Sequence, residues 1–137
     1  MSISAVPPAT RLARSRPATI ALWILQVLLA VVFLAAGAAK LTGAAPMVAM
    51  YDVIGVGQWF RYVTGGFEVG GAIALLTPRF CALAAPWLMC IMVGAITTHL
   101  AILQNSPIGP IVLLAGLGVI TYVRRHKLTA RVAGLHR

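Results

Sequence analysis

The feature that most limits what this chain can fold into is a series of apolar runs, each long enough to cross a lipid bilayer. The first run, residues 18–39, contains one strongly polar residue, Gln26. About 20 apolar residues are needed to cross the hydrocarbon core as a helix. Three further runs follow, at residues 60–76, 80–103 and 108–123. The sequence therefore predicts an all-α integral membrane protein with four transmembrane helices.

The first run also resembles a secretory signal peptide, because basic residues precede it and residues 36–38, Ala-Gly-Ala, resemble a cleavage site. The run of 22 residues at 18–39 is longer than the about 7 to 15 residues of a signal-peptide core. We therefore interpret it as the first transmembrane helix, with a cleaved signal peptide as the alternative.

The charges of the chain lie mainly outside the apolar runs. Hydrophobic residues make up 61% of the chain and charged residues 9%, whereas soluble domains carry about 25% charge. The net charge of +9 comes from 11 basic and two acidic residues, and most basic residues lie in residues 1–17 and 124–137. Because lysine and arginine collect on the cytoplasmic side of membrane proteins, we predict two cytoplasmic tails: a disordered one at 1–17 and a basic one at 124–137. This placement indicates contact with anionic lipids and excludes a nucleic-acid-binding role.

The links between the runs are short, which predicts antiparallel neighbours in an up-down-up-down bundle. The longest link, residues 40–59, is too rich in glycine to span a membrane. Within it, Pro46 is placed to start a short helix at the membrane interface, with Met50 and Tyr51 on its apolar side.

Four ionisable residues are predicted to share the outer half of this bundle. Lys40 ends the first run, Arg61 begins the second on the same side, and His99 lies near the outer end of the third. Glu68 lies about 10.5 Å deeper than Arg61 on nearly the same helix face. An ionisable residue in a span costs about 2.5 to 3.5 kcal/mol on insertion scales and normally faces a partner or a cavity. We predict that Lys40 or Arg61 pairs with Glu68 and that His99 closes the cluster.

This cluster has two interpretations. It either fixes the register of the helices, as buried polar groups do in some proteins, or forms the floor of a pocket that opens to the outer side. The chain has no nucleotide loop, nucleophile elbow or metal-ligand spacing. We therefore predict no metal and no intrinsic cofactor, assign no catalytic residue, and expect no catalytic activity of the chain on its own.

Helix packing is predicted at two places. Gly66, Gly70 and Ala74 recur at four-residue intervals, a stripe that lets another helix approach closely, either in a membrane-protein partner or in a second copy of the chain. Gln26 is predicted to form a hydrogen bond between helices.

Several short motifs occur in the order of a known family. Residues 37–41, Gly-Ala-Ala-Lys-Leu, match a Gly-x-x-Lys-Leu signature, and residues 64–71, Thr-Gly-Gly-Phe-Glu-Val-Gly-Gly, match a Thr-Gly-x-x-Glu-x-x-Gly segment. Residues 78–79, Pro-Arg, and 94–99, Gly-Ala-Ile-Thr-Thr-His, continue the match. Over about residues 20–122 the chain thus resembles the DoxX-like family of small four-span bacterial membrane proteins.

The resemblance implies a multi-pass protein of the bacterial cytoplasmic membrane that is linked to redox chemistry. Founding members of the family are membrane subunits of a thiosulfate:quinone oxidoreductase, and others act as assembly factors. We therefore expect an accessory subunit whose outward-facing pocket binds a quinone or a similar lipid-like molecule through Lys40, Arg61, Glu68 and His99. The alternative is a non-enzymatic assembly factor or scaffold for another membrane protein. Residues 55–57, Gly-Val-Gly, depart from the Gly-x-Pro that relatives often have before the second span.

Overall fold

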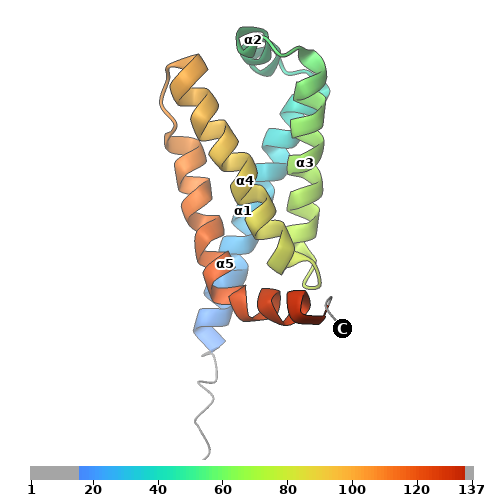
Figure 1. The fold of residues 1–137 in the computed structure, drawn as a ribbon, viewed down its shortest axis with the longest axis vertical. Helices are drawn as coiled ribbons and strands as arrows, with labels where there is room; N and C mark the ends of the chain where they lie inside the picture. Colours follow the sequence, from blue (N-terminus) through green and yellow to red (C-terminus); the bar gives the residue numbers. More distant parts are fainter. Residues whose placement is uncertain (1–15, 135–137) are drawn as a thin grey trace, which may run out of the picture.

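The computed structural model describes residues 16–134. These residues form helices joined by short links, so the described part of the chain has an all-α fold. Its long helices run up and down the molecule and one short helix crosses them at the upper end (Figure 1). The helices in chain order are α1 (Arg16–Thr42), α2 (Ala45–Ile54), α3 (Gln58–Leu76), α4 (Cys81–Thr98), a π-helical continuation η1 (His99–Leu103) and α5 (Ile108–Gly134).

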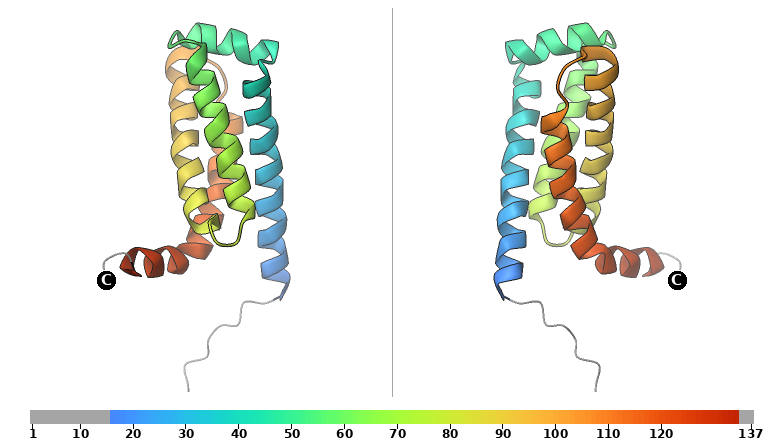
Figure 2. Two further views of the ribbon diagram at one scale, coloured as in Figure 1. Left: turned by 90° about the vertical axis from the view of Figure 1, so that its right-hand side faces the viewer. Right: turned by 90° about the vertical axis from the view of Figure 1, so that its left-hand side faces the viewer.

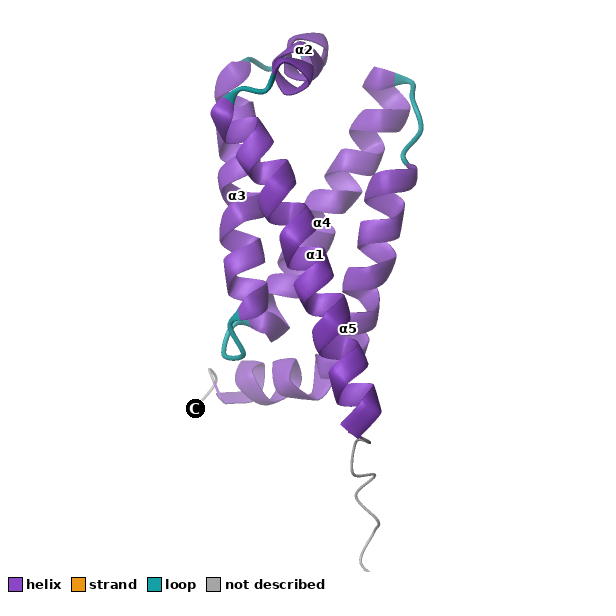
Figure 3. Ribbon diagram, turned by 180° about the vertical axis from the view of Figure 1, so that it is seen from behind, coloured by secondary structure: helices purple, strands orange, loops and turns teal. Residues whose placement is uncertain are grey.

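The four long helices form two pairs that separate toward one end. Helix α1 packs mainly on α3, and α4 mainly on α5. The pairs converge near the turn at residues 77–80 and diverge toward α2, as the view from behind shows (Figure 3). We call the converging end, which includes Leu75, Leu88 and Arg124, the closed half, and the end beneath α2 the open half. Side views show α2 lying across the open half (Figure 2).

Close packing in the closed half depends on glycine. A Cβ atom added to Gly71 of α3 would lie 2.5 Å from the Cδ2 atom of Leu88 in α4, and Leu88 is fully buried. A Cβ added to Gly116 of α5 would lie 3.2 Å from both methyl groups of Leu29 in α1. The α3–α4 contact therefore leaves no room for a side chain at position 71, and the α1–α5 contact leaves little room at position 116.

The α1–α3 contact also uses glycine, but not the stripe that the sequence indicated. A Cβ on Gly37 would lie 2.8 Å from the carbonyl oxygen of Gly65, so the two backbones touch. At Gly66 and Gly70, an added Cβ would have no described atom within 4 Å. Within α3, the glycines that bring helices together are thus Gly65 and Gly71, each one position away from a glycine of the predicted stripe. Contact of Gly66, Gly70 and Ala74 with a partner protein stays a prediction.

Three helical segments are long and apolar enough to cross a membrane: Arg16–Thr42, Cys81–Leu103 and Ile108–His126. The chain is therefore an α-helical membrane protein with several such helices. Helix α3 does not meet this criterion, because Arg61, Glu68 and its glycines lower its mean hydropathy. Both charged side chains of α3 point inward, and each residue is only 4% exposed.

Several predicted boundaries change in the structure. Helix α1 already begins at Arg16, inside the predicted tail 1–17, of which residues 1–15 lie outside the described range. The short helix predicted after Pro46 is present as α2, so the described chain has more helices than the four predicted. The predicted tail from 124 onward is wrong in one respect, because α5 continues to Gly134 and Arg124 is buried in the bundle.

Candidate ligand-binding cavity

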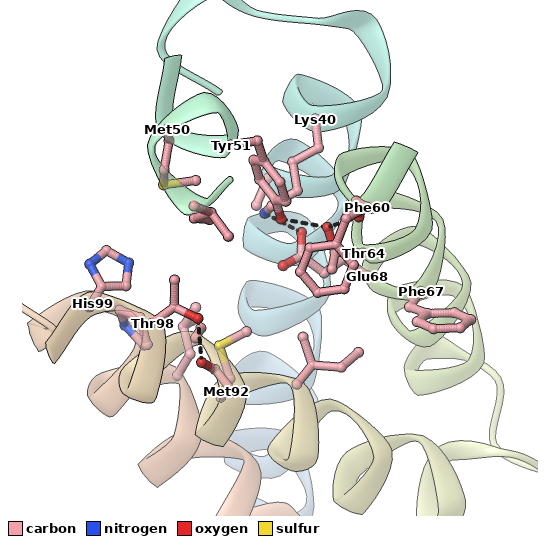
Figure 4. A pocket seen from close by; sticks show the side chains of 18 of the residues that line it. Lys40, Met50, Tyr51, Phe60, Thr64, Phe67, Glu68, Met92, Thr98 and His99 are labelled. Carbon is pink, nitrogen blue, oxygen red and sulfur yellow. Dashed lines mark hydrogen bonds and ion pairs between the residues drawn. The ribbon is translucent and has the colours of Figure 1, made fainter. Parts of the chain in front are cut away.

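The open half contains a cavity of about 460 Å³, which is within the range of small-molecule sites. Residues of all four long helices, α2 and η1 line it (Figure 4). Most of the wall is apolar and includes Phe33 of α1, Ile91 of α4 and Leu113 of α5. The cavity exists because the two helix pairs diverge here while α2 spans the space between their ends.

An ion pair forms the most polar part of the wall. The Lys40 Nζ atom donates to the Glu68 Oε2 atom at 2.7 Å, and both residues line the cavity. Their side chains are 11% and 5% exposed. Lys40 lies in the last turns of α1, and Glu68 lies in the middle of α3. The close contact of these two helices at Gly37 and Gly65 brings the two side chains within reach of each other. The prediction that a basic neighbour pairs with Glu68 is confirmed, and that neighbour is Lys40.

Arg61 is buried but does not line the cavity. Its guanidinium group donates to the carbonyl oxygen of Lys40 near the end of α1, and its Nε atom donates to Gln58 Oε1 at 2.7 Å. A cation at this place satisfies a terminal carbonyl and complements the negative end of the helix dipole. Arg61 therefore stabilises the end of α1, which differs from the predicted role as a ligand contact.

His99 lines the same cavity from the start of η1, on the side opposite the ion pair (Figure 4). Its Nδ1 atom forms a hydrogen bond with Asn105 Oδ1. The structure thus brings His99 and Glu68 to one cavity, but no hydrogen bond among residues 16–134 joins the His99 ring to the ion pair. Empty space, rather than direct contact, separates the two parts of the predicted cluster.

Two hydroxyl groups that sequence reasoning did not select complete the polar wall. Tyr51 of α2 and Thr64 of α3 form a hydrogen bond of 2.5 Å, and both line the cavity. Burial of the Tyr51 hydroxyl raises its pKa above the usual value, more than the hydrogen bond with Thr64 lowers it. Two features of the sequence could have indicated them: Tyr51 lies on the apolar side of the predicted short helix, and Thr64 belongs to the motif at residues 64–71. This hydrogen bond joins α2 to α3 at the cavity wall, and Gln58 of α3 also donates to the Val48 carbonyl oxygen of α2.

The closed half has a separate polar network. Gln26 of α1 donates through Nε2 to the carbonyl oxygen of Leu75 in α3, and it accepts a hydrogen bond of 2.9 Å from the NH2 group of Arg124 in α5. The predicted interhelical role of Gln26 is confirmed. Within residues 16–134, no group of three or more His, Cys, Asp or Glu residues could hold a metal ion.

The fold and the cavity define a small α-helical membrane protein with a mostly apolar ligand-sized site. The model of the DoxX-like family matches residues 24–123, and this chain belongs to that family. No curated protein and no solved structure matches the chain.

Proposed function

We propose that this protein is an accessory membrane subunit of a redox-linked complex and that its cavity binds a quinone or a similar lipid-like molecule. The observation that carries this proposal is the Lys40–Glu68 ion pair in the wall of an otherwise apolar cavity. A quinone head needs polar partners on a few atoms and apolar contact everywhere else, which is the usual composition of a small-molecule site. Lys40, Glu68, Tyr51 and His99 would hold the head.

A bound quinone would supply the redox chemistry of the site. The residues of this chain would bind and orient the molecule and keep water from it. We propose that electrons reach or leave the site through a partner protein, so that the chain alone has no catalytic activity.

We also propose that α3 crosses the membrane as the fourth span, in a bacterial inner membrane with both chain ends in the cytoplasm. The inward direction of Arg61 and Glu68 supports this, since the outer face of α3 then presents apolar residues, including Val63 and Ile73, to lipid. In a cysteine-free background, a membrane-impermeant maleimide added outside the cell should label Val56→Cys, just before α3, but not Thr77→Cys, just after it. Labelling of both positions would contradict a fourth span.

Extraction of the protein from its native membrane tests the ligand. We expect isoprenoid quinone to co-purify with the wild-type protein and with Gly118→Leu, and to be largely lost from Gly94→Leu. Both glycines have open space where a side chain would begin, but only Gly94 lines the cavity. Wild-type protein without any quinone or prenyl lipid would contradict the proposal.

The second candidate function is an assembly factor or scaffold. It is favoured by the free outer face of α3, where an added Cβ at Gly66 or Gly70 has no described neighbour within 4 Å. Under this proposal, Gly66→Leu with Gly70→Leu abolishes capture of a membrane-protein partner, and Glu68→Gln leaves it intact. The quinone proposal predicts instead that the double glycine variant retains its quinone and quinol, and that Glu68→Gln retains less of the two together.

A further inference from the structure

The polar side chains that line the cavity have an unequal supply of hydrogen-bond donors and acceptors. Thr64 has one hydroxyl hydrogen, and its Oγ1 atom lies 3.0 Å from the carbonyl oxygen of Phe60, one turn earlier in α3. If Thr64 donates to that carbonyl, the hydrogen between the two hydroxyl groups must come from Tyr51. The Tyr51 oxygen is then left with lone pairs only. This wall of the cavity therefore offers an acceptor and no donor from its hydroxyl pair.

The opposite wall repeats this pattern. Thr98 donates its hydroxyl hydrogen to the carbonyl oxygen of Gly94 at 2.9 Å, so its oxygen can only accept from a ligand. The Oδ1 atom of Asn105 can only accept, so we place the hydrogen of the neutral His99 ring on Nδ1. The Nε2 atom of His99 is then an acceptor.

The ion pair supplies the one donor among these side chains. Glu68 Oε2 accepts from Lys40, and its Oε1 atom has no hydrogen-bond partner among the described residues. The ammonium group of Lys40 has three hydrogens, of which the bond to Glu68 uses one. Lys40 and Glu68 together therefore present a donor and an acceptor side by side, with no net charge.

We infer that the cavity prefers the hydroxyl-bearing, reduced form of its ligand, a quinol, over the corresponding quinone. This inference rests on the proposed function, and it deepens it by naming the form that binds. A hydroxyl group at the ion pair can accept from Lys40 and donate to Glu68 at the same time. A second hydroxyl group can donate to His99 across the cavity. A quinone carbonyl can accept from Lys40, but it leaves Glu68 Oε1 and His99 Nε2 without donors, and a buried acceptor without a partner is costly.

The polar groups of the cavity carry no net charge, which favours an uncharged ligand. The positive charge of Lys40 is matched by Glu68, and Arg61 is directed to the end of α1 rather than into the cavity. An anionic head group such as a phosphate or carboxylate would therefore find no free cation and several competing acceptors. An uncharged phenolic head is the chemistry that this arrangement recognises.

The test compares the two oxidation states of one short-chain probe. Full-length protein in lipid nanodiscs is titrated by calorimetry with a decyl-substituted benzoquinone and, under argon, with its hydroquinone. We expect the hydroquinone to bind about tenfold tighter, the effect of about one unpaired buried acceptor. Equal binding, or tighter binding of the quinone, would overturn the inference while leaving the proposed function standing. Binding of neither form would overturn both.

Two variants locate the preference. Glu68→Gln replaces an acceptor oxygen with an amide that also donates, so the ratio of the two affinities should fall to about one. Glu68→Gln also removes the charge partner of Lys40, which can affect folding. His99→Leu therefore provides a second test, on the cavity wall opposite the ion pair. It should weaken hydroquinone binding about fivefold to tenfold and change quinone binding less than twofold.

Thr97→Val is the matched control, because Thr97 donates to the Val93 carbonyl oxygen on the same helix but does not line the cavity. It should change neither affinity. If His99→Leu weakens the two forms equally, the assignment of an acceptor at Nε2 is wrong and the inference fails.

Discussion

The closed and open halves of the bundle each bury a polar group that joins helices, but they differ in what surrounds it. In the closed half, Gln26 joins Leu75 of α3 to Arg124 of α5, and fully buried residues such as Leu117 and Ile120 fill the neighbouring space. In the open half, Lys40 and Glu68 pair beside a cavity of about 460 Å³. A buried polar network alone therefore does not indicate a binding site. The open half differs from the closed half because a cavity lies beside its polar groups.

The difference follows from the charges available to each half. The only two acidic residues of the chain, Asp52 and Glu68, belong to the open half, so Arg124 has no acidic side chain nearby. Arg124 instead donates to the Gln26 amide, and its guanidinium lies 6.0 Å from the centre of the Trp23 ring. Its burial serves the contact between helices. Lys40 and Glu68 are instead matched in charge and remain available to a ligand.

The largest difference in stability between variants of the two halves should come from replacing one glycine in each half with leucine. Gly71→Leu forces a side chain against the fully buried Leu88, and we expect a loss of about 3 kcal/mol in the free energy of unfolding, or failure to fold. Gly94→Leu enters the cavity and should leave the Tm in detergent, followed by circular dichroism, near the wild-type value. Similar losses in both variants would mean that the two halves are equally packed.

A smaller loss should follow from breaking the closed-half network. Gln26→Leu removes the acceptor of Arg124 and leaves a buried charge with no other hydrogen-bond acceptor among the described residues. We expect a loss of about 2 kcal/mol in the free energy of unfolding and no change in quinone retention. The double variant Gln26→Leu with Arg124→Leu should recover part of the loss in Tm. A loss of quinone in Gln26→Leu would show that the closed half contributes to the site.

Removing the ion-pair charge in the open half should have the opposite profile. Glu68→Gln keeps an oxygen that can accept from Lys40, so we expect a loss of about 1 kcal/mol in the free energy of unfolding. Hydroquinone affinity should fall about tenfold, equal to about 1.4 kcal/mol. Unchanged affinity, with the Tm lowered as in Gln26→Leu, would indicate that the ion pair only fixes helix register.

The smallest effect should come from the helix that covers the cavity. Tyr51→Phe removes the hydrogen bond to Thr64 and should lower the free energy of unfolding by about 0.5 to 1 kcal/mol. Relative to the wild-type protein, amide hydrogen exchange should become faster in α2 and stay unchanged in α4. Tyr62→Phe is a control, because Tyr62 is exposed on the outer face of α3. Equal exchange rates in the two variants would show that this hydrogen bond does not hold α2.

The sequence was sufficient to predict the part of the site that depends on topology. Short links between long apolar runs require antiparallel neighbours, and this alone puts Lys40 and Glu68 in the same half of the bundle. Pro46 correctly indicated the short helix α2, which begins at Ala45. The predicted pairing of His99 with the cluster was only partly right, because sequence spacing does not reveal how far the helix pairs diverge.

The details that were missed depend on helix register and on backbone conformation. The paired glycines at 65–66 and 70–71 offer two faces of α3, and only the position of the neighbouring helices decides which of them packs. The contact of Tyr51 with Thr64 depends on how the chain folds back through three glycines with positive φ, Gly43, Gly55 and Gly57. The sequence places Arg124 in the basic tail because it directly follows the last apolar run, and the Gln26 acceptor that it meets in the bundle is 98 residues away in sequence.

The most direct test of the central claim is photolabelling of the protein in its membrane with an azido-quinone, followed by mapping of the labelled peptides. The account predicts labels on the cavity wall, in α2 and between Met92 and Leu103, that excess unlabelled quinone suppresses and that Gly94→Leu abolishes. Labels confined to outward residues such as Ile73 and Val112, unaffected by competitor, would contradict a quinone site in the open half.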